Sequence, residues 1–163
     1  MEAYTKIEES QNTTAQFIKF ETGSQSFGID VLNSREIVRE EKITSIPESP
    51  DFVKGVIDLR EEIVPIVNLK NLFGITGLKN NSENEKKIII IKVDGVLIGL
   101  EVNKVDEIIE VALETIKDAP SITKNYAKNY IKGVANHNNN LIIILDVNNI
   151  FSSEEIKKIK KVQ

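Results

Sequence analysis

The sequence predicts an all-β protein built from two small, related β-barrels. Apolar residues occur in short runs rich in Val, Ile and Phe, and the residues between the runs are mostly Gly, Asn, Asp or Pro. This pattern is typical of short strands separated by turns. Helical patterns are sparse, and the second half of the chain repeats features of the first. Short strands with frequent turns favour small barrels over a layered α/β sheet.

Three hairpins are expected from turns that contain Gly or Asn, in addition to the charged hairpin tip at 60–62 described below. The second has the strongest signal, because Asp94-Gly95 separates two apolar runs and both central residues of such a turn need a positive φ. Helical segments are expected only at 68–73, at 121–130 and in the tail after Ser152, where glutamates come first and lysines last, as suits a helix dipole. The hairpin strands are expected at 17–20 with 27–31, at 88–93 with 96–102, and at 130–135 with 141–147.

An internal repeat divides the chain. A shift of 71 residues aligns Gly28 with Gly99 and Glu36 with Glu107, and a shift of 78 aligns the Lys-Gly-Val triplet starting at Lys54 with a second one. Chance similarity between strands is the alternative explanation. The repeat predicts a first barrel at 16–78 and a second barrel at 86–151. The polar composition predicts a disordered segment at 1–15 and a linker at 79–85, and the charge pattern predicts a C-terminal helix or tail at 152–163.

The composition argues against several classes of function. The chain of 163 residues has no cysteine, a net charge of −4 and one histidine, His137, in an Asn-rich turn. Without cysteines there can be no disulfide scaffold and no thiolate site, and a mildly acidic chain does not suit nucleic acid. No phosphate-binding loop is present, and the acidic residues suggest no metal site. We therefore expect no enzyme, no cofactor and no metal. The chain shows no signal peptide or membrane span, so an intracellular, soluble protein is expected.

Two groups of residues are candidates for a binding surface. Arg60, Glu61 and Glu62 interrupt an otherwise apolar stretch at a predicted hairpin tip. They could form a solvated turn, or Arg60 could pair with a carboxylate of a partner, as arginine often does at interfaces. Glu36 and its repeat counterpart Glu107 could be outward-facing strand residues, a device against edge pairing, or contacts.

The motifs FGIDVLNSREI, ITSIPESPDFVKGVIDLREEIVPIVNLKNLFGI, GLEVNKVDEI and YIKGVANHNNNLIIILDVNNIF resemble the CheW family of chemotaxis coupling proteins. The resemblance covers residues 16–151. It implies two five-stranded, SH3-like barrels around a shared apolar seam, and no catalysis. It also implies a cytoplasmic scaffold that couples the cytoplasmic tips of chemoreceptors to the regulatory domain of the histidine kinase CheA. The scaffold would be a monomer in isolation, would form ring arrays with CheA near the membrane, and would neither insert into the membrane nor bind nucleic acid.

The resemblance also implies which residues contact each partner. Arg60 and Glu36 match receptor-contacting positions of the family, and Val105 matches an apolar position of the same groove. Ser34 and Glu61 belong to this receptor site but depart from the family, which usually has valine and glycine there. Glu61 could pair with Arg60 in the free protein. The kinase contact is expected at Ile37, Lys54 and Gly55.

Two other functions remain open at this stage. A CheW-like adaptor of a chemosensory pathway that does not control swimming would have the same motifs. A small-barrel nucleic-acid module would need a basic groove with stacking aromatic residues. Phe17, Phe20 and Phe27 instead alternate with polar residues, as strand residues facing a core do.

Overall fold

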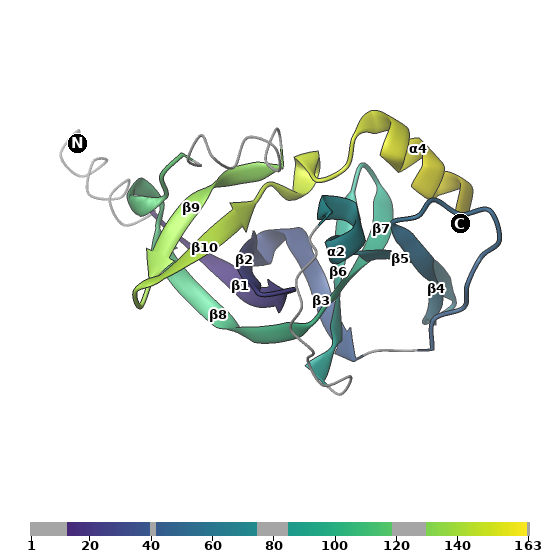
Figure 1. Ribbon diagram of the computed structural model, residues 1–163, viewed down its shortest axis with the longest axis horizontal. Helices are drawn as coiled ribbons and strands as arrows, with labels where there is room; N and C mark the ends of the chain where they lie inside the picture. The colour runs from purple at the N-terminus through teal and green to yellow at the C-terminus, as the bar shows by residue number, and fades with distance from the viewer. Residues whose placement is uncertain (1–12, 40–41, 75–84, 119–129, 163) are drawn as a thin grey trace, which may run out of the picture.

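A computed structural model describes residues 13–39, 42–74, 85–118 and 130–162. The described part contains two five-stranded sheets, which Figure 1 shows side by side as two barrels. The all-β fold class is therefore confirmed. The first barrel has the strand order β8-β1-β2-β10-β9, and the second has β3-β6-β7-β5-β4. The strands of the first barrel are β1 (Thr14–Thr22), β2 (Gln25–Asp30), β8 (Lys104–Ala112), β9 (Ile131–His137) and β10 (Asn140–Leu145). Those of the second are β3 (Ser34–Arg39), β4 (Val53–Leu59), β5 (Glu62–Asn68), β6 (Lys87–Val93) and β7 (Val96–Val102).

The three predicted hairpins are present as β1–β2, β6–β7 and β9–β10. Asp94 and Gly95 have φ values of 51° and 78°, so the β6–β7 turn has the geometry that its sequence predicted. β1 begins at Thr14, one residue before the end of the segment expected to be disordered. Residues 1–12 of that segment, and most of the helix expected at 121–130, lie outside the described residues.

The barrels do not coincide with the sequence segments 16–78 and 86–151. The first barrel combines β1 and β2 from the first repeat with β8, β9 and β10 from the second, and the second barrel combines the remaining strands in the same way. The cause is the sheet pairing: β1 of the hairpin β1–β2 pairs with β8, and β6 of the hairpin β6–β7 pairs with β3. Each repeat therefore contributes its first two strands to one barrel and its last three to the other.

The strand pairing bears out the repeat itself. Gly28 on β2 is the parallel partner of Ile144 on β10, and Gly99 on β7 is the parallel partner of Ile66 on β5. The irregularities in the strands match as well, because the bulge at Arg35 recurs at Asp106 and the bulge at Lys54 recurs at Lys132. β-Bulges are specific features of a fold, so two matching pairs argue against chance similarity.

One isolated bridge closes each sheet into a barrel. In the second barrel, Thr44 forms two backbone hydrogen bonds of 2.9 Å with Val56 of β4, the strand farthest from β3 in the sheet order. In the first barrel, Lys117 forms the equivalent bonds, of 2.9 and 2.7 Å, with Val134 of β9. The chain that leaves β3 or β8 thus returns to the opposite edge of the same sheet.

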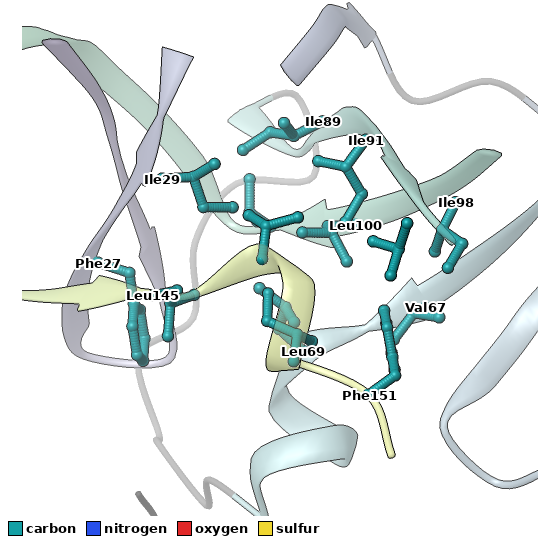
Figure 2. Packing of buried hydrophobic residues seen from close by; sticks show 14 of the residues in the cluster. Phe27, Ile29, Val67, Leu69, Ile89, Ile91, Ile98, Leu100, Leu145 and Phe151 are labelled. Carbon is teal, nitrogen blue, oxygen red and sulfur yellow. The ribbon is translucent and has the colours of Figure 1, made fainter. Parts of the chain in front are cut away.

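The apolar residues form one shared core and two barrel interiors. On β6, Ile88 and Ile90 face the interior of the second barrel, whereas Ile89 and Ile91 face the shared core. Successive strand residues point to opposite faces, so a run of four buried isoleucines indicates a strand that is covered on both sides. Figure 2 shows the shared core, where side chains of the first barrel meet those of the second: Phe27, Ile29 and Leu145 against Ile89, Ile91 and Leu100.

Two α-helices join the shared core. Helix α2 (Leu69–Phe73) begins at Asn68, whose side chain accepts a hydrogen bond from the Asn71 amide, and ends at Gly74 with φ 67°. Helix α4 (Ser153–Val162) inserts Ile156 and Ile159 into the core, and the Ser152 and Glu155 side chains form a reciprocal capping box. Both helices were predicted from the sequence. Short 3₁₀ turns occur at η1 (Val31–Asn33), η3 (Leu113–Thr115) and η5 (Val147–Asn149).

Candidate functional site

The candidate site lies at the two-residue turn between β4 and β5. Leu59 pairs with Glu62, and the two residues between them, Arg60 and Glu61, have φ values of 50° and 72°. Asp58 supports the turn, since its Oδ1 accepts a hydrogen bond of 2.9 Å from the Glu61 amide. Glycine or asparagine is favoured in such a turn. This turn therefore holds two large charged residues in a backbone conformation that stores strain.

The turn places Arg60 against Glu36 of β3. The two guanidinium nitrogens of Arg60 donate to the two carboxylate oxygens of Glu36, with Nη1 to Oε2 at 3.3 Å. In the sheet order, β3 and β4 are the first and last strands. The ion pair therefore joins opposite edges of the sheet at the barrel closure. Within the described residues Arg60 thus pairs with Glu36. The pairing with its neighbour Glu61, which the sequence had suggested, is not formed there.

This ion pair remains accessible to a partner. The Arg60 side chain is 71% exposed and that of Glu36 is 30% exposed. The hydrogen bond from Arg60 to Glu36, followed by the charge of Glu36, raises the pKa of Arg60 above its usual value. Arginine has five N–H donors in a planar fork. Two of them bond Glu36, which leaves others for a carboxylate or carbonyl group of a partner.

The structure brings Glu36 and Arg60 together, with Ser34 and Glu61 as their near neighbours in the chain, and it places Ile37 and Val105 apart from them. On β3, Ser34 and Glu36 are half-buried, whereas Ile37 is exposed on the other face of the strand. The Ser34 hydroxyl donates to the Val31 carbonyl at 2.9 Å, so its polar group is used within the chain. Val105 lies on β8 in the other barrel, half-buried against the shared core.

The structure gives Lys54 and Gly55 roles inside the protein. The Lys54 Nζ lies 2.7 Å from Oε2 of Glu101, a carboxylate on β7 whose side chain is 2% exposed. Asn68 donates to the other oxygen of Glu101 at 3.1 Å. A Cβ atom at Gly55 would collide with the Thr44 carbonyl oxygen at the barrel closure. Glycine is therefore required at position 55 for close packing of two backbone segments.

Sequence reasoning missed two features of this region. The first is Leu32, an exposed leucine in the η1 turn two residues before Ser34, with 90% of its surface accessible. In the sequence it looks like one more residue of an apolar run, so nothing distinguished it. The second is the buried Glu101, which follows Leu100 in a strand and whose burial no sequence pattern indicated.

The equivalent turn of the first barrel carries asparagine in place of arginine. Asn138 and Asn139 connect β9 to β10 with φ values of 52° and 66°, the same backbone geometry as Arg60 and Glu61. His137 precedes this turn as a half-buried residue. Within the residues that the structure describes, no cluster of His, Asp and Glu is placed to hold a metal ion. In the same residues, no helix has both the length and the apolar character needed to span a membrane.

The model of the CheW-like domain matches residues 16–155 of this chain. The chain belongs to the CheW family. The "Chemotaxis protein CheW" of Treponema pallidum is 30% identical over 146 residues, which cover 88% of this chain and 86% of that protein. That of Klebsiella aerogenes is 32% identical over 148 residues, or 90% and 87% of the two chains. The crystal structure of the scaffolding protein TtCheW from Thermoanaerobacter tengcongensis superposes with a TM-score of 0.78 at 30% identity. It covers 86% of this chain and 90% of that one. The CheW family expected from the motifs is thus confirmed.

Proposed function

We propose that this CheW-family protein is a non-enzymatic chemotaxis scaffold that couples chemoreceptors to the histidine kinase CheA. The family membership supports this function, because the relatives are named as chemotaxis proteins and the solved structure is named as a scaffolding protein. The protein would act in the cytoplasm and would be recruited to receptor arrays at the membrane. A scaffold needs two separate contact surfaces on a rigid body, and the barrels with their shared core supply that body.

The observation that carries the proposal is the exposed Arg60–Glu36 pair. A charged, two-pronged contact fixed at a barrel closure presents a defined geometry to a partner. Receptor docking on this side would use Arg60 and Glu36, with Ser34 and Glu61 beside them and Val105 as an apolar contact. Glu61 would limit the approach to Arg60, because it adds a side chain where the family usually has glycine.

The kinase contact would lie on the opposite side of β3. Ile37 points away from the face that carries Glu36, so the two partners could bind at the same time. Lys54 and Gly55 would contribute to this contact indirectly, by fixing where the backbone of β4 lies. The Lys54 ammonium group is bound to Glu101, and Gly55 is packed against Thr44. The regulatory domain of the kinase would bury apolar area around Ile37.

The test compares single substitutions in binding assays with receptor fragments and the kinase. Arg60→Ala should weaken co-sedimentation with receptor at least about tenfold, while the thermal unfolding midpoint and kinase binding stay near wild type. Ile37→Ser should give the opposite result, with kinase binding lost and receptor binding kept. Lys92→Ala is the matched control, because Lys92 is another exposed cation of the second barrel. Retained receptor coupling in Arg60→Ala, or unfolding of that variant, would overturn the receptor assignment.

A further inference from the structure

A cleft lies between helix α4 and the loop that leads into β4. Its walls are formed by the loop residues 46–50 and by Lys158, Lys161 and Val162 of the helix, and its volume is about 530 Å³. We call it the α4 cleft. Figure 1 shows the C-terminal end of α4 beside this loop. Pockets of about 300–1,000 Å³ are usual for bound ligands, so a short segment of a partner fits the α4 cleft by size.

Both walls of the α4 cleft are held in place. On the loop side, the Ser49 hydroxyl donates to the Ile46 carbonyl at 3.0 Å. The Pro50 carbonyl accepts a hydrogen bond of 2.9 Å from the amide of Val53, the first residue of β4. On the helix side, Ile159 is fully buried in the shared core. The cleft is therefore formed before any partner binds, which lowers the entropic cost of binding.

The α4 cleft is positively charged, although the chain as a whole is acidic. Helix α4 has four lysines and two glutamates, whereas the chain has a net charge of −4. Lys158 and Lys161 are exposed, and within the described residues neither forms an ion pair. Among the described residues that line the cleft, Glu48 alone is acidic. Two ammonium groups and one carboxylate leave the cleft with a net positive charge.

The surroundings of the two lysines are apolar. Lysines near the C-terminal end of a helix also stabilise the helix itself, which accounts for their place in the sequence but not for the walls around them. Ile46, Pro50 and Val162 line the cleft as half-buried residues. A surface that combines cations with apolar walls is complementary to a segment that carries both carboxylates and apolar side chains.

The position of the α4 cleft favours the kinase over the receptor as its occupant. The loop 46–50 leads into the start of β4, where Lys54 and Gly55 belong to the proposed kinase contact. Arg60 follows the other end of this strand, about 20 Å away at about 3.3 Å per residue. A partner bound at the start of β4 can therefore reach the α4 cleft and leave the Arg60–Glu36 pair uncovered.

We propose that the α4 cleft binds an acidic segment of the histidine kinase. Carboxylates of this segment pair with Lys158 and Lys161, and its apolar side chains pack on Ile46 and Val162. The inference rests on the proposed kinase contact and adds a charged second contact to the apolar one at Ile37. Exposed charges are screened by salt, and the screening length falls from about 10 Å at 0.1 M to about 3 Å at 1 M. Kinase binding should therefore weaken as the salt concentration rises.

The first experiment reverses the charge of the cleft and measures kinase binding by calorimetry. Lys158→Glu/Lys161→Glu should weaken binding at 0.1 M salt at least about tenfold and should abolish most of its salt dependence. The control is Lys92→Glu/Lys157→Glu, which makes the same change in net charge at exposed lysines outside the cleft. It should bind the kinase within about twofold of the wild type. Equal binding by the cleft variant and its control would overturn the proposal.

The second experiment looks for tighter binding, which a misfolded variant cannot produce. Glu48→Lys replaces the acidic residue of the cleft with a third cation. It should strengthen kinase binding at least about threefold at 0.1 M salt and make the salt dependence steeper. Unchanged or weaker binding of a folded Glu48→Lys protein would contradict the proposal.

The third experiment identifies the contact by chemistry. A carbodiimide couples lysine amines to carboxylates that touch them, so it should link the wild-type protein to the kinase through Lys158 or Lys161. Lys158→Arg/Lys161→Arg keeps both charges but removes both amines. This variant should bind the kinase like the wild type and lose those cross-links, which peptide mass spectrometry would map. Cross-links that avoid both lysines in the wild type would overturn the proposal.

The substitution at Ile37 separates this inference from the function on which it rests. If Ile37→Ser binds the kinase like the wild type, the proposed kinase contact itself is wrong. If Ile37→Ser loses kinase binding while Lys158→Glu/Lys161→Glu keeps it, the α4 cleft alone is refuted.

Discussion

Lys54 offers a test of whether a residue expected at a binding surface instead stabilises the fold. Its ammonium group lies 2.7 Å from a carboxylate oxygen of Glu101, which is buried on β7, two strands away in the sheet. Lys54→Met keeps most of the side-chain volume and removes the charge. Glu101 would then retain the 3.1 Å hydrogen bond from Asn68 as a remaining partner.

The size of the effect follows from burial. Breaking a fully buried ion pair costs about 3–5 kcal/mol, because the remaining charge is left without compensation. The Lys54 side chain is 37% exposed, so water can approach the carboxylate in the variant, and Asn68 still donates to it. We therefore expect a loss of about 1–3 kcal/mol in the free energy of unfolding. For a chain of this length, that corresponds to a midpoint lower by about 3–10 °C.

The assay is thermal and urea unfolding of a double-mutant cycle. Lys54→Met/Glu101→Gln should recover much of the lost stability, because both charges are then removed. Lys132→Met is the control, since Lys132 occupies the equivalent bulge of the first barrel and is exposed. Equal stability losses in the Lys54 and Lys132 variants would refute the argument. Wild-type stability of Lys54→Met with lost kinase binding would show that Lys54 acts mainly at the interface.

Three further substitutions test other parts of the fold by chemical denaturation. Glu61→Gly should stabilise the protein by about 0.5–1 kcal/mol, because the relief of a strained φ of 72° exceeds the entropy cost of glycine; a loss of stability would show that the turn is unstrained. Gly99→Ala should cost about 1–3 kcal/mol, because its Cβ would lie 2.6 Å from Ile66 and 2.7 Å from Ile88; a neutral result would mean that the barrel interior can yield. Ile159→Ala should cost about 2–5 kcal/mol if α4 is an integral part of the shared core, and a cost below about 0.5 kcal/mol would contradict that.

Local features of the fold could be predicted from the sequence because their signals are local. The Asp94-Gly95 turn and the Ser152 cap depend on residues close together in the chain. The exchange of strands between the repeats could not be predicted. It depends on which hairpin pairs with which third strand, and the apolar patterns of the two repeats are too similar to decide this.

The candidate site shows the same limit. Arg60 was recognised at a hairpin tip, and Glu36 was recognised through the repeat and the family motifs. Their mutual ion pair was not predicted, because barrel closure brings together the first and last strands of a sheet order that the sequence does not reveal. The internal partner of Lys54 was missed for a related reason: Glu101 is 47 residues away and its burial follows from the parallel pairing of β5 and β7.

The exchange of strands has an evolutionary consequence. A single repeat could not complete either barrel, since its first two strands and its last three belong to different ones. A one-repeat ancestor would therefore have folded only as an intertwined symmetric homodimer, as in domain swapping. Fusion of two gene copies would have joined such a dimer into one chain, in which the two halves could then differ in sequence. In the present chain one of the two equivalent turns carries Arg60 and the other carries Asn138, so the two barrels present unlike ends.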